Sequence, residues 1–205
     1  MKVLIINGSP RKNGNTSIAI QEMIHVFQQE NVETEIISIG TQSIHGCIAC
    51  NSCKKTGKCV FQDDVNKANT IFQEADGLII ASPVYFASAN ASLVAFVQRM
   101  FYSADFDTTM KVGASVVVAR RGGLSSTFDE LNKFFTISNM PIASSQYWNS
   151  VHGRLPGEAE EDKEGLQTVR TLAKNMVFLM KAIQLAKEKY GLPEKEEHIS
   201  TNFVH

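Results

Sequence analysis

The first loop of the chain, residues 7–17, is the feature that most constrains its fold. An apolar run, Val3–Ile6, precedes the loop, and a segment with apolar residues at helical spacing, about residues 16–30, follows it. A strand–loop–helix junction of this kind is a candidate anion site, because backbone N–H groups, hydroxyls and the positive end of the helix dipole converge there. Gly8 and Gly14 would let the backbone approach a ligand closely.

The type of anion can be narrowed by elimination. Five residues separate Gly8 from Gly14 and Asn15 stands where a Walker A lysine would be, so the loop is not a nucleoside triphosphate site. The dinucleotide pattern G-x-G-x-x-G is also absent, and residues 38–40 offer no acid for a ribose. The remaining hydroxyl and amide groups, with an arginine at the rim, suit a single terminal phosphate such as that of FMN. The predicted phosphate ligands are Ser9, Arg11, Asn15, Thr16 and Ser17.

The rest of the chain alternates short apolar runs with helical patterns, which predicts an α/β sandwich with a parallel sheet. Strands are expected at 3–6, 34–39, 77–82, 111–119 and 141–145, and helices at about 16–30, 65–75, 93–101, 126–136 and 169–190. Asp63 and Asp64 are expected to cap the second of these helices. Residues 1–190 would then form one domain, and residues 191–205 a tail that is disordered or lies on a neighbouring subunit.

Ligands of parallel sheets bind beyond the carboxyl ends of the strands, so the segments that follow strands define the candidate site. We expect the first loop, the segments after the third, fourth and fifth strands, and a cysteine-rich loop after the second to share one edge. A flavin needs a phosphate cup, flat surfaces for its ring and donors to the ring edge. The predicted ring contacts are Pro83, Val84, Tyr85, Phe86, Gly122, Gly123 and Trp148, with Arg120 or Arg121 offsetting the charge of a reduced flavin. The alternatives are a core-capping loop, a turn with solvated arginines and a core tryptophan.

Four cysteines, Cys47, Cys50, Cys53 and Cys59, lie within the loop 46–60 in the spacing C-x2-C-x2-C-x5-C. Structural zinc usually has two separated ligand pairs, whereas a tight run of this kind suits a compact iron–sulfur cubane. Three lysines in the loop would offset the negative charge of the thiolates. Bound zinc, structural thiols and redox-active thiols remain alternative interpretations.

These motifs together resemble the flavodoxin-like NAD(P)H-dependent FMN reductases. The resemblance is in the GSPR…GNTS loop, in Ser82-Pro83-Val84-Tyr85-Phe86 and in the Arg-Gly-Gly turn, and it extends over most of residues 1–190. It implies a flavodoxin-like three-layer sandwich with a five-stranded parallel sheet of order 2-1-3-4-5, bound FMN, and a homodimer or homotetramer with the flavin near a subunit interface. The cysteine spacing resembles the iron–sulfur flavoprotein branch, in which a [4Fe–4S] cluster relays electrons to FMN.

The composition argues against some classes of partner and against a membrane-spanning segment. A net charge of −1 gives no reason to expect nucleic acid or an anionic membrane as partner, and no apolar run approaches the ~20 residues that span a bilayer. The chain starts with a strand-like run and shows no signal peptide, so we expect a cytoplasmic protein with reduced thiols.

The function predicted from the sequence is that of an FMN-dependent oxidoreductase. Electrons would pass between NAD(P)H or a ferredoxin-like donor and a quinone, a flavin or a similar small acceptor, with no catalytic acid or base because the flavin carries the chemistry. The alternative is a non-enzymatic electron carrier, or a sensor that reports through its cysteines.

Overall fold

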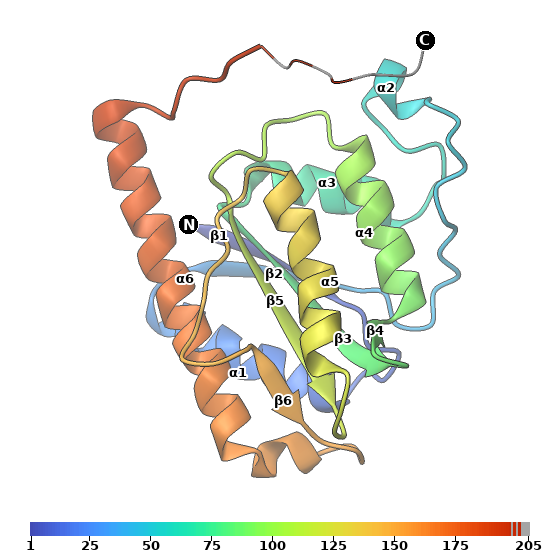
Figure 1. The fold of residues 1–205 in the computed structure, drawn as a ribbon, viewed down its shortest axis with the longest axis vertical. Coiled ribbons are helices and arrows are strands. Elements are labelled where there is room, and N and C mark those ends of the chain that lie inside the picture. Colours follow the sequence, from blue (N-terminus) through green and yellow to red (C-terminus); the bar gives the residue numbers. More distant parts are fainter. Residues whose placement is uncertain (198, 200, 202–205) are drawn as a thin grey trace.

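A central sheet organises the chain, and helices cover both of its faces (Figure 1). The computed structural model describes residues 1–197, 199 and 201. Five strands are parallel and lie in the order β2-β1-β3-β5-β6, while the short β4 pairs antiparallel with the end of β3. Their bounds are β1 Lys2–Asn7, β2 Glu33–Ser38, β3 Gly77–Tyr85, β4 Ser88–Ala89, β5 Val112–Ala119 and β6 Ser150–His152. The predicted order of the parallel strands is confirmed, with β4 as a sixth strand that the sequence pattern did not indicate.

The predicted position of the fifth parallel strand is wrong. Within the predicted range 141–145, only Ile142 pairs with the sheet, as an isolated bridge to Gly113, and the regular strand is β6. The ladder is interrupted because Ser145 and Asn149 close a turn between the two segments: the Ser145 hydroxyl bonds to Asn149 Oδ1 at 2.7 Å. Short polar side chains therefore compete with the strand at this point.

The helices form the two outer layers. The main ones are α1 Asn15–Gln29, α3 Asp64–Glu74, α4 Ala91–Ser103, α5 Leu124–Ile137 and α6 Lys163–Tyr190, and the short ones are α2 Cys53–Thr56 and the 3-10 helix η1 Glu158–Glu161. Alternate residues of β1 serve opposite faces: Val3 and Ile5 pack in the core under α1 and α6, whereas Leu4 and Ile6 pack in the core under α3, α4 and α5. As expected, Asp63 caps α3 by accepting a hydrogen bond from the Val65 N–H at 3.2 Å.

The long helix α6 ends at Tyr190, where the sequence predicts the end of the last helix. In its described part the tail has no helix or strand; residues 198, 200 and 202–205 of the predicted tail lie outside the described residues. Lys195 donates a hydrogen bond to Asp107 at 2.7 Å, and chiefly for this reason the pKa of Asp107 falls to about 2. None of the helices described is both long and apolar enough to cross a membrane.

Candidate cofactor site

A pocket of about 180 Å³ lies at the carboxyl edge of the parallel sheet. It brings together the loops that follow β1, β3, β5 and β6, and we call it the cup. Its lining residues are Ser9, Arg11, Gly14, Asn15, Thr16, Pro83, Val84, Tyr85, Val118, Ala119, Arg120, Gly153 and Arg154. The sequence-predicted residues of three separate segments therefore converge on one pocket, as the topology of the sheet requires.

The amino end of α1 forms the floor of this pocket. Gly14 is the N-cap residue and provides no side-chain cap, and the first turn contains no acidic residue. Among the described residues, the N–H groups of Asn15 and Thr16 have no protein acceptor. These two free donors at the positive end of the helix dipole suit a bound anion.

Several predicted phosphate ligands use their side chains to build the loop itself. The Asn15 amide donates to the Leu155 carbonyl at 2.9 Å and accepts from the Ala159 N–H at 3.2 Å, so it ties the cup to the segment after β6. The Ser9 hydroxyl accepts from the Arg11 N–H at 3.2 Å. Ser17 does not line the pocket, because its hydroxyl donates to the Lys12 carbonyl at 2.9 Å.

Arginines from three different loops surround the pocket. Arg11 and Arg120 are among the residues that the sequence predicts, whereas Arg154 is not, because the fifth strand is expected too early in the chain. Arg11 Nη1 donates to the Arg154 carbonyl at 3.3 Å. The N–H groups of Leu155 and Arg154 donate to the Glu158 carboxylate at 3.0 and 2.6 Å, which lowers the pKa of Glu158 and fixes this turn.

The β3–β4 hairpin presents the aromatic residues of the predicted ring site. Phe86 and Ala87 adopt positive φ values of 52° and 61°, and the Phe86 side chain is fully exposed. Helix α5 holds the hairpin in this conformation, since Ser126 Oγ donates to the Ala87 carbonyl and the Ala89 N–H donates to Glu130 Oε2, both at 2.8 Å. A strained turn held by outside contacts is typical of functional sites.

The glycines after β5 lie beside this hairpin. Gly123 has φ +84°, and a Cβ there would lie 2.7 Å from the Cα of Ala87, so a larger residue would displace the hairpin. Gly122 is open: apart from its two chain neighbours, no described residue has a heavy atom within 4 Å of the position that a Cβ would take. Both are adjacent to the pocket but do not line it.

Trp148 does not have the position from which its contact with the flavin ring was predicted. Trp148 is expected to follow the fifth strand at the site edge, but it precedes β6 and does not line the pocket. Its ring is about half exposed and lies against Tyr147 with ring centroids 5.3 Å apart.

The four cysteines line a second, small pocket together with Arg99 and Tyr102 of α4. This cysteine pocket does not share the carboxyl edge with the cup, contrary to expectation. The loop leaves β2 and runs beside α4, so that α2 lies near the carboxyl end of that helix (Figure 1). The other end of α4 touches the cup side of the sheet, where the Asn90 N–H donates to Ser82 Oγ at 3.0 Å. The 13 residues of α4 span about 20 Å.

Arg99 is the residue that sequence analysis missed at the cysteine pocket. Its side chain is 1% exposed and forms an ion pair with Asp63. Two of its N–H groups, Nε and Nη2, donate to the Cys59 sulfur at 3.3 and 3.2 Å. Burial acts to lower the pKa of Arg99, but Asp63 and Cys59 outweigh it and the pKa is raised. The sequence signal that could have indicated it is an arginine on the apolar face of the helix that became α4.

The sulfur atoms of Cys47 and Cys50 also accept hydrogen bonds, whereas Cys53 Sγ donates to the Tyr102 carbonyl at 3.9 Å. Cys47 Sγ accepts from the Ala49 N–H at 3.5 Å, and hydrogen bonds from Ser52 lower the pKa of Cys50. Within the described residues, no three His, Cys, Asp or Glu side chains are grouped as ligands of a single metal ion. Donors aimed at cysteine sulfurs that share one pocket fit an iron–sulfur cluster, whose sulfurs are commonly hydrogen bonded.

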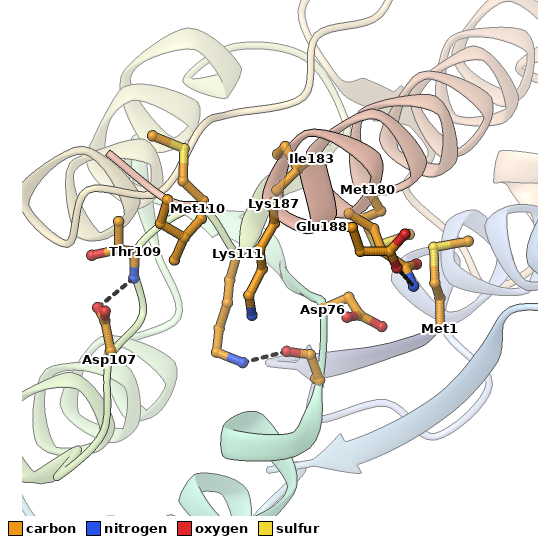
Figure 2. A pocket seen from close by; sticks show the side chains of 13 residues that line it. Met1, Asp76, Asp107, Thr109, Met110, Lys111, Met180, Ile183, Lys187 and Glu188 are labelled. Carbon is orange, nitrogen blue, oxygen red and sulfur yellow. Dashed lines mark hydrogen bonds between the residues drawn. The ribbon is translucent and has the colours of Figure 1, made fainter. Parts of the chain in front are cut away.

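The largest of these cavities, about 600 Å³, lies at the amino edge of the sheet, away from all predicted site residues (Figure 2). Lys111 crosses it and donates to the carbonyls of Ala75 and Gln73 at 2.5 and 3.0 Å. Burial lowers the pKa of Lys111. This lysine satisfies carbonyls at the end of α3, which is a structural role.

Comparison with known proteins agrees with this arrangement. The family model described as NADPH-dependent FMN reductase matches residues 1–154. An iron–sulfur flavoprotein of Methanocaldococcus jannaschii is 36% identical over 192 residues, covering 90% of this chain and 100% of that protein. An iron–sulfur flavoprotein of Methanosarcina thermophila is 32% identical over 194 residues, covering 92% and 100%.

A solved structure of a Streptococcus pneumoniae flavodoxin superposes with a TM-score of 0.58 at 14% identity, covering 87% of this chain and 99% of that one, and this supports the flavodoxin-like fold. The family match covers three quarters of the chain, includes the loops after β1, β3 and β5, and ends two residues after β6. The chain therefore belongs to the NADPH-dependent FMN reductase family, and it is similar over most of its length to proteins named iron–sulfur flavoproteins.

Proposed function

We propose that this protein binds FMN in the cup and transfers electrons between NAD(P)H or a ferredoxin-like donor and a quinone, a flavin or a similar small acceptor. The observation that most supports this is the convergence of three arginines and a free helix N-terminus on one pocket. FMN, when bound, supplies both two-electron hydride chemistry and one-electron exchange. The protein's own residues bind it, orient it and adjust its charge.

The phosphate would be held by charge and by backbone donors. Arg11 and Arg154 both line the pocket and would supply positive charge, and the free N–H groups of Asn15 and Thr16 would donate to the same phosphate. The Asn15 side chain acts indirectly, since it ties the loop to residues 155–159. Ser9 and Ser17 shape the loop through their hydroxyls.

The ring would lie along the residues that follow β3. Pro83, Val84 and Tyr85 line the pocket, and the fixed hairpin places Phe86 outside it, facing solvent. Arg120 also lines the pocket, and its charge would stabilise an anionic reduced ring. Gly122 and Gly123 follow it and leave room for backbone donors at the ring edge.

The four cysteines would hold a [4Fe–4S] cluster, which supplies one-electron exchange. Support comes from their shared pocket and from the donors to the sulfurs of Cys59 and Cys47. The cytoplasm, where thiols stay reduced, suits such a set of ligands.

The separation of the two pockets along α4 supports an assembly as a homodimer or homotetramer. Because the cup lies at one end of the helix and the cysteine pocket at the other, a cluster in one protomer would serve the flavin of its partner. The exposed Phe86 beside the cup offers an apolar contact for such a neighbour.

Anaerobic purification with FMN, followed by an absorption spectrum, iron and sulfide analysis and molecular mass determination, tests this proposal. We expect one FMN and one cluster per chain and turnover of NAD(P)H or of a reduced ferredoxin with an added quinone. A protein that binds no FMN contradicts the proposal. A protein that binds FMN but shows only stoichiometric electron transfer with every donor is a carrier instead.

A further inference from the structure

Arg99 is a buried cation that does not line the cup. It lies in the last turns of α4, 1% exposed, and its guanidinium is surrounded by Cys59, Asp63, the His45 carbonyl and the Phe61 ring. Burying a charged group this deeply costs free energy on folding, so specific interactions must offset that cost.

The guanidinium joins both ends of the cysteine loop to the helix. Nη1 donates to the His45 carbonyl, just before the first cysteine, at 3.2 Å, and to Asp63, just after the last, at 2.6 Å. The planar fork of arginine can reach these points at once, which a lysine cannot. These contacts anchor the loop to α4.

The contact with Cys59 has a different character from these anchoring bonds. Nε and Nη2 both point at one sulfur, at 3.3 and 3.2 Å, although the ion pair with Asp63 alone would satisfy the charge. Cys47 and Cys50 are exposed, whereas the Cys59 sulfur is partly shielded and has a cation against it. Charge and hydrogen bonds at cysteine sulfurs are among the protein's means of setting the potential of a cluster.

We propose that Arg99 is a positioning residue that sets the reduction potential of the iron–sulfur cluster through its two hydrogen bonds to Cys59. This inference rests on the proposed function, because it concerns the cluster assigned there to the cysteines. Reduction adds one electron to the cluster, and a fixed positive charge at Cys59 favours the more negative, reduced state. Asp63, on the far side of the guanidinium, partly offsets this charge.

The arrangement predicts opposite effects for the two partners of the ion pair. Arg99→Met removes the charge but keeps the length of the side chain, so the cluster becomes harder to reduce and its potential shifts downward. Asp63→Asn leaves the Arg99 charge without its counterion, so the potential shifts upward. Asparagine is also a good N-cap, which should preserve the start of α3.

The experiment is a spectroelectrochemical titration of the anaerobically reconstituted full-length wild type and of both variants, with iron, sulfide and FMN content determined for each. Lys54→Met is the matched control. Lys54 contacts the Tyr102 carbonyl at 3.2 Å on the same loop, but it is exposed and its charge is screened by water. Arg99→Lys is included because it keeps the charge if the methionine variant fails to fold, and its shift should be smaller than that of Arg99→Met.

Shifts of opposite sign for Arg99→Met and Asp63→Asn, each larger than that of Lys54→Met, support the inference. Shifts of the same sign, or no shift beyond the control, overturn it and leave Arg99 as a packing residue. If Arg99→Met does not fold, an upward shift in Asp63→Asn supports the inference and an unchanged potential overturns it. A wild type that holds FMN but no iron also overturns it and leaves FMN binding intact, whereas a wild type without FMN contradicts the proposed function.

Discussion

The cup at the carboxyl edge and the cysteine pocket at the end of α4 are held in place by different means. The cup is made by backbone at the ends of parallel strands, and its arginines are exposed. The cysteine pocket lies on a long loop whose buried anchor is Arg99 of α4, with further contacts to Asn66 and Tyr102. A site built on strand ends keeps its shape when a charged side chain is lost, whereas a site anchored by a buried ion pair depends on that pair.

Removing one arginine charge from each region should change the free energy of unfolding by very different amounts, and this is the largest difference that we expect. Arg99→Met should lower the free energy of unfolding by about 3–5 kcal/mol, because it leaves Asp63 without its buried partner. Arg120→Met should change it by no more than about 0.5 kcal/mol, because Arg120 is exposed. Urea denaturation of the FMN-free proteins measures both. Equal losses in the two variants would mean that the distinction is wrong.

Of the arginines in the two regions, those of the cup should affect FMN affinity and Arg99 should not. Arg11→Met and Arg154→Met should each weaken FMN binding about tenfold, or about 1.4 kcal/mol, through loss of a charge-assisted contact to the phosphate. Riboflavin, which lacks the phosphate, should bind to wild type and variants alike. Fluorescence titration measures these affinities, with Lys12→Met as a control in the same loop. A parallel loss of riboflavin affinity would place the arginines at the ring instead.

The turn at Arg154 should give the cup a pH dependence. Glu158 accepts two backbone N–H bonds that lower its pKa below the usual 4.5, so its support is complete above that value and is lost as the pH falls through the lowered pKa. Glu158→Gln should reduce FMN affinity by about threefold at pH 7, since a neutral acceptor is weaker. The wild type should release FMN more steeply than the variant in acid. Identical pH profiles would exclude this role.

Of these substitutions, Trp148→Ala should have the smallest effect on FMN affinity. Because this side chain precedes β6 and does not line the cup, FMN affinity should change by less than about twofold, within the range of surface substitutions. A stopped-flow or equilibrium titration is sufficient. A larger loss would restore the interpretation of Trp148 as a stacking residue, supplied by a neighbouring protomer.

The cup could be predicted from the sequence because each of its parts follows a strand. Apolar runs located β1, β3 and β5, and the parallel topology then brings the next residues together. Arg154 was not predicted as a site residue, because Ser145 and Asn149 interrupt the fifth strand with a local turn. This competition between polar side chains and the hydrogen bonds of the sheet cannot be recognised from a pattern of apolar residues.

The surroundings of the cysteines could not be predicted in the same way. Their spacing indicates a metal or cluster site, but the direction in which the loop leaves β2 depends on tertiary contacts. Arg99 is 40 residues away from Cys59 in the chain, and nothing in its local sequence pairs the two. Long-range side-chain contacts of this kind become visible only in the fold.

The most direct test of the central claim is anaerobic reconstitution of the double variant Arg11→Met/Arg154→Met with iron, sulfide and FMN. If the cup and the cysteine pocket are independent sites, this variant should hold the same amount of iron as the wild type while its FMN affinity falls by about tenfold or more; the two losses need not add, because Arg11 contacts Arg154. Loss of iron together with FMN, or FMN affinity equal to that of the wild type, would contradict the account.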